Sequence, residues 1–239
     1  MYPYLLRIGP LYLPTFGVLA AVGCMVALFQ SQRTARLVGL DPDQLWDAGL
    51  FAIVAAFSVS RVLLVLANLR TFFNYPMLLL TVPSLTATGL LLTALATFIW
   101  LRWKRMSVLR ALDAWAACAT TLWSFLALGH FAEGSDLGMR SQFGLLGRGE
   151  SARLVPVALY AAGAALAASA GLWWLLGRSR RAGETAGAGL VAAGLGQFLL
   201  SFWRQPGVTG VAGLDVLQWV ALGMVTSGFV LLSTPRRMA

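Results

Sequence analysis

The chain has 239 residues, of which 59% are hydrophobic and only 11% are charged, and its formal net charge is +9. A soluble globular domain has about a quarter of its residues charged, so the composition excludes that class and predicts an integral membrane protein. A basic domain interleaved with aromatic residues, of the kind that binds nucleic acid, is also not found in the sequence. Anionic lipid headgroups are therefore the expected partner of the positive charge.

Seven apolar stretches are predicted as transmembrane helices, because a helix crosses a hydrocarbon core of about 30 Å with about 20 apolar residues. They cover residues 11–30, 46–67, 84–101, 111–129, 155–176, 187–203 and 214–233. The third and sixth are short, and the boundaries are good to about four residues. The predicted fold is all-α, a single polytopic transmembrane domain over residues 1–239 with seven spans.

The basic residues predict the orientation, because Lys and Arg near span ends are retained on the cytoplasmic side. Connections after the odd-numbered spans hold Arg33, Arg36, Arg102, Lys104, Arg105, Arg110, Arg178, Arg180, Arg181, Arg236 and Arg237. The other side holds fewer: Arg7, Arg70, Arg140, Arg148, Arg153 and Arg204. The N-terminus is therefore expected outside and the C-terminus in the cytoplasm.

Charged residues inside or beside a span are costly and point to function or to an internal partner. Arg61, in FSVSRVLLVLAN of the second span, either pairs with an acid, reaches the interface, or binds lipid phosphate through its planar guanidinium. Arg204, in SFWRQPG at the outer end of the sixth span, is either an ordinary interfacial arginine beside Trp203 or part of a site on the same face as the His130 loop. Asp47 and Asp113 lie near the inner ends of their spans, where a helix-start charge is the expected role.

The stretch ALGHFAEGSDLG, residues 127–138, holds the only histidine, His130, followed closely by Glu133 and Asp136. It leaves the fourth span on the predicted outer side, where it is either a solvated loop or a reactive cluster. Gly134 and Gly138 permit the positive φ angles and the close backbone approach that a headgroup site uses.

In their order along the chain, these landmarks resemble the motifs of the prolipoprotein diacylglyceryl transferase family. The matching segments are RIGPLYLPTFG at 7–17, GLDPDQLWD at 39–47, SRVLLVLAN at 60–68, LRALDAWA at 109–116, GHFAEGSDLG at 129–138, VPVALYA at 155–161 and FWRQPG at 202–207. The resemblance implies a multi-pass enzyme of the bacterial inner membrane. Such an enzyme moves diacylglyceryl from phosphatidylglycerol to the thiol of a lipobox cysteine in a precursor protein, and releases glycerol phosphate at the outer face. It uses no metal and no organic cofactor.

The resemblance assigns substrate binding and loop roles to residues that match the family's motifs. These are Arg61 and Asn68 in the second span, Phe131, Gly134 and Gly138 in the signature loop, Pro156, Leu159 and Tyr160 in the fifth span, and Arg204 in the sixth. Other positions depart from the family pattern. Thr86 stands near the place of a histidine, Ala127 in place of the signature arginine, His130 of an asparagine or cysteine, Glu133 of an asparagine, Ser135 of a glutamate, Val155 and Ala158 of a histidine and a glutamine, and Phe16 of a tyrosine.

The chemistry that the resemblance implies needs a base and fixed cations. A cysteine thiol with a pKa of about 8.5 is mostly protonated at neutral pH, so its proton must be removed before the sulfur attacks. The leaving glycerol phosphate gains charge, so cations must lie beside it. We therefore predict that His130 is the base, with Glu133 or Asp136 orienting the imidazole. Arg61 and Arg204 are predicted to converge on one lipid headgroup.

Other interpretations stay open at this stage. The chain is alternatively a paralogue that binds phospholipid or lipoprotein without the transfer, an enzyme with a different transfer reaction on the same lipid, or a membrane scaffold or transporter subunit. A retinal protein is excluded, because its Schiff base needs a lysine in the last span and the only lysine is Lys104, in a predicted inside connection.

Overall fold

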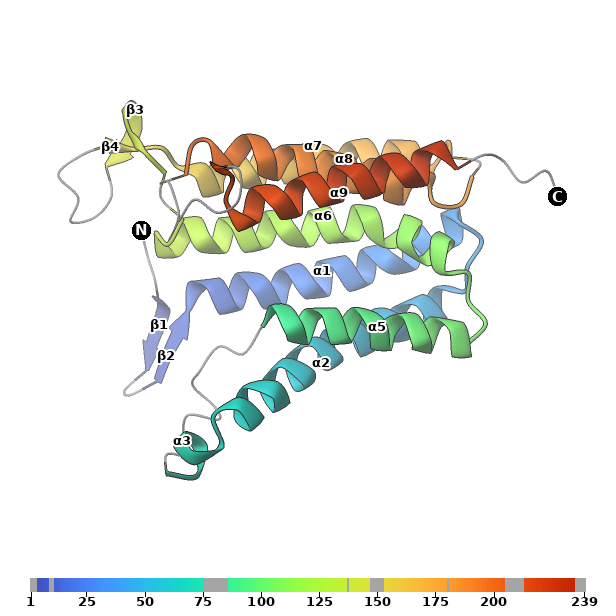
Figure 1. Cartoon of the computed structure of the whole chain (residues 1–239), viewed down its shortest axis with the longest axis horizontal. Helices are drawn as coiled ribbons and strands as arrows, with labels where there is room; N and C mark the ends of the chain where they lie inside the picture. Colours follow the sequence, from blue (N-terminus) through green and yellow to red (C-terminus); the bar gives the residue numbers. More distant parts are fainter. Residues whose placement is uncertain are drawn as a thin grey trace.

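The chain is predominantly helical in the computed structural model, which describes residues 4–8, 11–74, 86–136, 138–146, 153–179, 181–204 and 213–234. The long helices are α1 (Thr15–Leu37), α2 (Pro42–Ala67), α5 (Ala87–Trp103), α6 (Val108–Glu133), α7 (Val157–Leu176), α8 (Glu184–Ser201) and α9 (Val216–Ser233). Short elements are β1 (Tyr4–Ile8), β2 (Leu11–Pro14), α3 (Leu69–Asn74), β3 (Arg140–Leu146) and β4 (Arg153–Leu154). Figure 1 shows the long helices running roughly side by side, with the strands at one end.

A helix lies at each of the seven apolar stretches, but the first begins later than predicted. Residues 11–14 belong to the apolar run, yet they form β2, which pairs antiparallel with β1. Helix α1 begins only at Thr15, after Pro14. Apolar character alone does not separate a short strand from the first turn of a helix, and the helix begins four residues after the predicted boundary, within the tolerance given for it.

Among the described residues, α1, α2, α6, α7 and α9 are long and apolar enough to cross a membrane. Helix α5 is apolar but has only 17 residues. Helix α8 is not among these five helices, and it includes the polar residues Glu184 and Gln197. The chain is thus a multi-pass membrane protein by the length and composition of its helices, whereas the count of seven spans stays a prediction.

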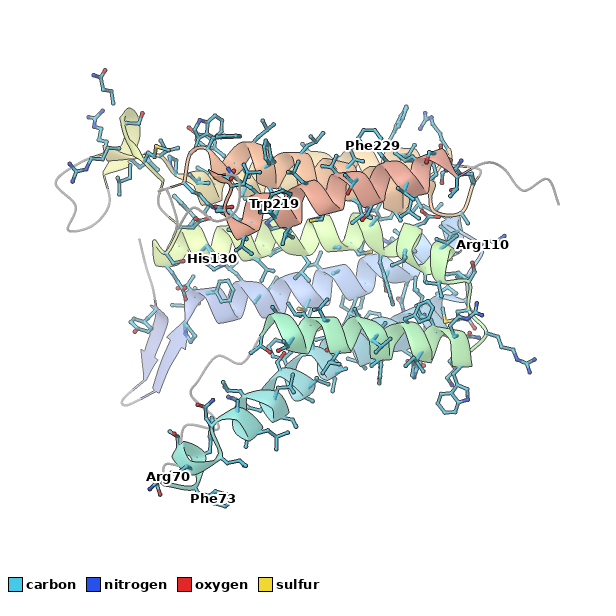
Figure 2. All side chains as sticks on the ribbon, viewed as in Figure 1. Arg70, Phe73, Arg110, His130, Trp219 and Phe229 are labelled. Atoms are coloured by element: carbon cyan, nitrogen blue, oxygen red, sulfur yellow. The ribbon has the colours of Figure 1, made fainter. Side chains whose placement is uncertain are left out.

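Helix α6 lies at the centre of the bundle. It packs against α1, α7 and α8, while α2 packs against α1 and α5, and α9 packs against α8. Its buried residues are small, which lets neighbouring backbones approach closely, as is typical of helices packed in lipid. They include Ala111, Ala114, Ala117, Cys118, Thr120, Thr121, Ser124, Ala127 and Gly129. Figure 2 places His130 at one end of this helix and Arg110 at the other, and we call these the His130 end and the Arg110 end of the bundle.

Buried polar groups in the bundle find partners on neighbouring helices. Asp113, 3% exposed on α6, accepts hydrogen bonds from the backbone N–H groups of Gly183 (2.6 Å) and Ala186 (2.8 Å). It therefore caps the N-terminus of α8, whose first N–H groups have no partner inside the helix. The prediction of a charge at the start of its own helix was wrong, because Asp113 lies inside α6 and serves a different helix.

The C-terminal end of α9 is held in a similar way. The guanidinium group of Arg181 donates hydrogen bonds to the carbonyl oxygens of Leu231 (2.6 Å), Leu232 (2.7 Å) and Thr234 (2.6 Å). These carbonyls are among the last of the helix and lack intrahelical donors. Arg181 and Asp113 together attach both α8 and α9 to the rest of the bundle at the Arg110 end.

Removing the Asp113 cap is expected to destabilise the bundle. In Asp113→Ala, the N–H groups of Gly183 and Ala186 lose their acceptors within an apolar layer, so the free energy of unfolding is expected to fall by about 2 kcal/mol. Denaturant unfolding of the purified protein in detergent measures this change. Asp43→Ala, exposed in the first turn of α2, is the matched control and is expected to change stability by less than about 0.5 kcal/mol. Equal losses would contradict the capping role.

Candidate functional site

The candidate site begins where α6 ends, at the His130 end of the bundle. Gly134 follows the helix with a φ of +75°, a left-handed conformation that glycine adopts without strain. The N–H groups of Gly134 and Ser135 both donate to the carbonyl oxygen of His130, at 2.9 and 3.1 Å. This turn reverses the chain and brings Ser135 back onto the last turn of α6.

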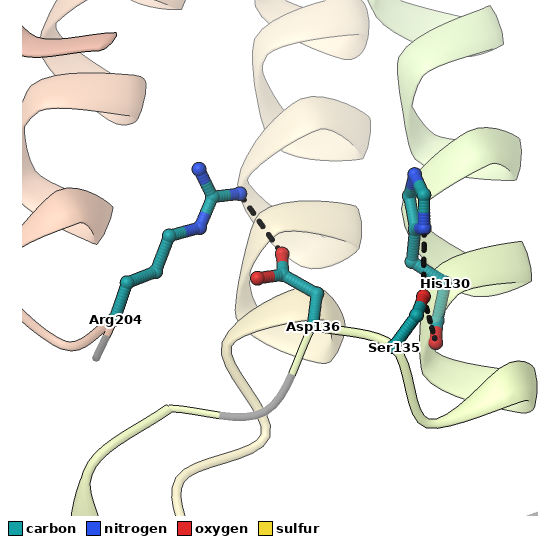
Figure 3. A network of polar contacts seen from close by, with 4 residues as sticks. All are labelled: His130, Ser135, Asp136 and Arg204. Carbon is teal, nitrogen blue, oxygen red and sulfur yellow. Dashed lines mark hydrogen bonds and ion pairs between the residues drawn. The ribbon is translucent and has the colours of Figure 1, made fainter. Parts of the chain in front are cut away.

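The imidazole of His130 is consequently paired with a hydroxyl. Its Nδ1 lies 2.9 Å from Ser135 Oγ, and that hydroxyl also donates to the carbonyl oxygen of His130 at 3.4 Å. The ring packs against Phe16 of α1, with 4.7 Å between the ring centroids. Figure 3 shows this pair on α6 and the turn that follows it.

The partner of the imidazole differs from the predicted one. Glu133 is the last residue of α6, and Asp136 is engaged by an arginine, so neither carboxylate makes a hydrogen bond to His130 among the described residues. The left-handed turn at Gly134 places the residue five positions after His130, rather than three or six, against the ring. Ser135 was named in the sequence only as a departure from the family pattern.

Asp136 pairs with Arg204, which follows α8. The distance from Arg204 Nη2 to Asp136 Oδ2 is 2.9 Å, and the two side chains are only 25% and 24% exposed. The Nε of Arg204 is buried and has no hydrogen-bond partner within the described part of the chain. Figure 3 shows the carboxylate of Asp136 directed toward Arg204, on the far side of the loop from the His130 pair.

Backbone hydrogen bonds hold the loops of this site together. Gly138 donates to the carbonyl oxygen of Val155 (2.9 Å), Met139 donates to that of Trp203 (2.9 Å), and Val155 donates to that of Met139 (3.0 Å). Gly138 and Arg204 also form an antiparallel bridge. The segments after α6, before α7 and after α8 therefore meet at the His130 end, although they are far apart in the sequence.

Tyr160, on the first turn of α7, adds an aromatic side chain to the same region. Its ring lies 5.7 Å from that of Trp203, centroid to centroid, and its side chain is nearly half exposed. Trp203 directly precedes Arg204, so Tyr160 is close to the Arg204 segment. The structure thus brings together His130, Gly134, Asp136, Gly138, Tyr160 and Arg204 from the predicted set.

Arg61 and Asn68 lie elsewhere, on α2 and at its end. Helix α2 packs against α1 and α5, and the layer formed by α1 and α6 separates it from α8 and Arg204 (Figure 1). Asn68 donates its side-chain N–H to the carbonyl oxygen of Leu64 at 3.1 Å. Arg61 and Arg204 therefore lie on different sides of this layer. Their predicted convergence on one lipid headgroup stays a prediction.

Thr86 is the N-cap residue of α5. Its hydroxyl accepts a hydrogen bond from the N–H of Gly89 at 3.1 Å and so caps α5. Its own N–H donates to the hydroxyl of Ser60 at 3.4 Å, which ties the start of α5 to α2. Near the place where the family pattern has a histidine, this chain therefore has a threonine that caps a helix.

Three further departures from the family pattern, Ala127, Val155 and Ala158, are apolar and packed. Ala127 is 4% exposed and lies in a hydrophobic cluster with Val157, Ala161, Ala162 and Leu200, against which Val155 packs. Ala158 is 1% exposed. The region beneath the His130 end is therefore closed by small hydrophobic side chains and holds no charge at these positions.

Comparison with known proteins matches one family model over nearly the whole chain and individual relatives over parts of it. Residues 3–234 match the family model of the prolipoprotein diacylglyceryl transferases. The phosphatidylglycerol–prolipoprotein diacylglyceryl transferase of Polynucleobacter necessarius subsp. necessarius (strain STIR1) is 30% identical over 158 residues, which are 61% of this chain and 59% of that protein. The protein of the same name from Staphylococcus haemolyticus (strain JCSC1435) is 31% identical over 64 residues, 27% of this chain and 23% of its own length. The matched region thus spans less than two thirds of either relative.

Gly138 is expected to tolerate no side chain. A Cβ at this position would overlap the carbonyl oxygen of Trp203 and would lie 2.6 Å from Val157 Cγ2, so Gly138→Ala must displace the loop that carries Asp136. We expect the free energy of unfolding to fall by about 1–3 kcal/mol. Gly163→Ala, on α7 with nothing within 4 Å of the added carbon, is the control and is expected to be neutral or slightly stabilising. Thermal unfolding in detergent compares them, and equal melting temperatures would contradict the tight contact.

Proposed function

Because the chain belongs to the prolipoprotein diacylglyceryl transferase family, we propose that it transfers diacylglyceryl from phosphatidylglycerol to the thiol of a lipobox cysteine in a precursor protein. The names of both relatives support this substrate pair. The observation that carries the proposal is that the only histidine and Arg204 lie at the same end of the bundle, each paired with one of two consecutive loop residues, His130 with Ser135 and Arg204 with Asp136. A base and a cation are the two groups that the transfer requires.

The proposal includes a place and an orientation in the membrane. Helices α5 and α8 cross together with the five longer apolar helices, so that the chain has seven spans in the bacterial inner membrane. The Arg110 end, where most basic residues gather, faces the cytoplasm. The His130 end then lies at the outer face, where phosphatidylglycerol of the outer leaflet and an exported precursor meet.

In the proposed reaction, His130 removes the proton from the cysteine thiol. The hydroxyl of Ser135 donates to the backbone carbonyl oxygen of His130 and can therefore accept from Nδ1–H. That arrangement leaves Nε2 unprotonated and able to take the thiol proton. A bond then forms between the sulfur and the glycerol carbon, the bond from that carbon to the phosphate oxygen breaks, and glycerol phosphate leaves. Glu133, at the last position of α6, adds a negative charge near the imidazolium that forms.

Arg204 is the proposed cation for the leaving phosphate. Asp136 engages only Nη2, so other N–H groups of the guanidinium are available to phosphate oxygens. The ion pair fixes the long side chain before the lipid arrives, which lowers the entropy lost when it binds. Gly138 and Tyr160 shape the same loops, and Arg61 and Asn68, on and at the end of α2, are proposed to contact the lipid from the other side of α1.

A second candidate function is supported by the packed positions below the site. Ala127, Val155 and Ala158 supply none of the polar groups that the family pattern has there, and they are packed or buried. In this second candidate function, the chain binds phosphatidylglycerol or a lipoprotein segment but does not transfer diacylglyceryl. The two candidates differ in one observable: whether precursor thiols become lipidated.

Complementation separates the two candidates. The chain is expressed in cells depleted of their own diacylglyceryl transferase, and maturation of lipoprotein precursors is followed by their mobility and mass. We expect mature lipoproteins when the chain is present and unprocessed precursors with an empty vector. If precursors remain unprocessed although the chain is inserted and retains phosphatidylglycerol, the transfer is excluded in favour of binding alone.

Substitutions at His130 test the proposed base. His130→Ala is expected to lower the rate of thiol lipidation by a factor of about 10²–10⁴, because a positioned base contributes about that much. His130→Asn is the sharper variant, since it keeps a polar side chain near Ser135 but cannot take the proton. Activity of His130→Asn equal to that of the unaltered chain would remove His130 from the mechanism. Ser135→Ala and Glu133→Gln, compared in the same assay, show which neighbour supports the imidazole.

A further inference from the structure

We propose that the chain binds a second anionic phospholipid near the Arg110 end, in a groove bounded by α1, α6 and α7. The groove has a volume of about 540 Å³, and it is lined by Val26, Phe29, Gln30, Gln32, Arg33 and Arg36 of α1, Thr121 of α6 and Trp173 of α7. Both α1 and α7 pack on α6, while they make few contacts with each other. Helix α6 thus forms the floor of the groove, and α1 and α7 form its walls.

The lining of the groove changes along its length. On α1, Val26 and Phe29 come first, then Gln30, then Arg33 and Arg36. Spacings of three and four residues place these side chains on one face of the helix, and ten residues of helix extend over about 15 Å. The groove therefore passes from an apolar part in the middle of the bundle to a cationic part at its end. A phospholipid has the same order of groups from its acyl chains to its phosphate.

Unlike Arg204, the two arginines have no carboxylate partner among the residues that the structure describes. Neither Arg33 nor Arg36 forms an ion pair with an acidic side chain in the part of the chain that the structure describes, and both are exposed. Two guanidinium groups at i and i+3 can share one phosphate, whose oxygens accept charge-assisted hydrogen bonds. The groove thus has the positive charge for one anionic headgroup.

Gln30 adds a polar amide to the lining of the groove. Its side-chain oxygen is buried and has no hydrogen-bond partner among the described residues. A buried amide without a partner costs about 1–3 kcal/mol, and this one lines the groove one turn deeper than Arg33. The ester groups of a phospholipid lie at that depth when its phosphate is level with Arg33 and Arg36. An ester has only acceptor atoms, so it would pair with the side-chain N–H group of Gln30 and not with the unpartnered oxygen.

This site is distinct from the proposed reaction site, and the inference does not rest on the transferase function. No histidine or cysteine lines the groove, so the lipid held there has no base or thiol beside it and is bound without being turned over. Under the proposed orientation it comes from the cytoplasmic leaflet.

Native mass spectrometry of the full chain in detergent tests the site, with phosphatidylglycerol as the titrant. In the double variant Arg33→Gln/Arg36→Gln, the affinity for one bound phosphatidylglycerol is expected to fall at least about tenfold. The control is Arg102→Gln/Arg110→Gln, which removes the same charge from exposed arginines near the same end but outside the groove. Its affinities are expected to stay unchanged. Equal weakening in the two double variants would overturn the proposal, because it would show a diffuse effect of surface charge.

Two further measurements are made with the same method. One compares possible sources of the phosphate, and the other uses a variant that keeps all arginines. Phosphatidylcholine, which is zwitterionic, is expected to be retained less tightly than phosphatidylglycerol, and free glycerol phosphate is expected not to displace the lipid. Retention of both lipids alike, or displacement by glycerol phosphate, overturns a site for an anionic lipid. Val26→Trp keeps all charges and fills the apolar part of the groove, so it is expected to lose the same lipid as the double arginine variant, and full retention in this variant overturns the proposal as well.

Discussion

The need to satisfy polar groups in an apolar bundle governs this structure. Water does not pair with backbone or side-chain groups inside hydrocarbon, so each must find a partner within the protein. Asp113 meets the first N–H groups of α8, Arg181 meets the last carbonyls of α9, and the hydroxyls of Thr121 and Ser169, 2.7 Å apart, join α6 to α7. Small residues on α6 allow these contacts, because they let the helices approach closely.

The groups proposed to act on the substrate lie where this rigid part ends. His130 is on the last turn of α6, Asp136 follows the turn at Gly134, and Arg204 follows α8. Side chains at helix ends are held by the bundle but are accessible from the interface, which suits a reaction between a lipid and an exported protein. The hydrogen bonds of Gly138 and Met139 fix the loops relative to one another. Small changes in these bonds therefore act on the distance between base and cation.

Much of the helical fold could be predicted from the sequence. The thickness of the hydrocarbon core requires about 20 consecutive apolar residues in each spanning helix, and such runs are visible in the sequence. All seven predicted stretches contain a helix, and the differences lie at the helix ends. Before Thr15, for example, an apolar segment pairs as a strand. The candidate site was predicted only in part. His130, Asp136, Gly138 and Arg204 were named as candidates, but their pairing depends on which loops meet in space, and sequence spacing does not contain that information. Ser135 reaches His130 through one left-handed residue, and Asp113 caps a helix that begins 71 positions later at Glu184.

The two cationic regions of the bundle differ in a way that bears on turnover. Arg204 is already paired with Asp136, so a lipid phosphate at the His130 end meets a guanidinium whose charge is partly neutralised. Arg33 and Arg36 have no such partner among the described residues. The net positive charge that faces a phosphate is therefore lower at the proposed reaction site than in the groove near the Arg110 end. A transferase must release glycerol phosphate after each cycle, and uniform tight binding of the ground state would not raise its rate. In the proposed reaction, Asp136 therefore has two roles: it positions Arg204, and it lowers the net positive charge that substrate and product phosphates meet.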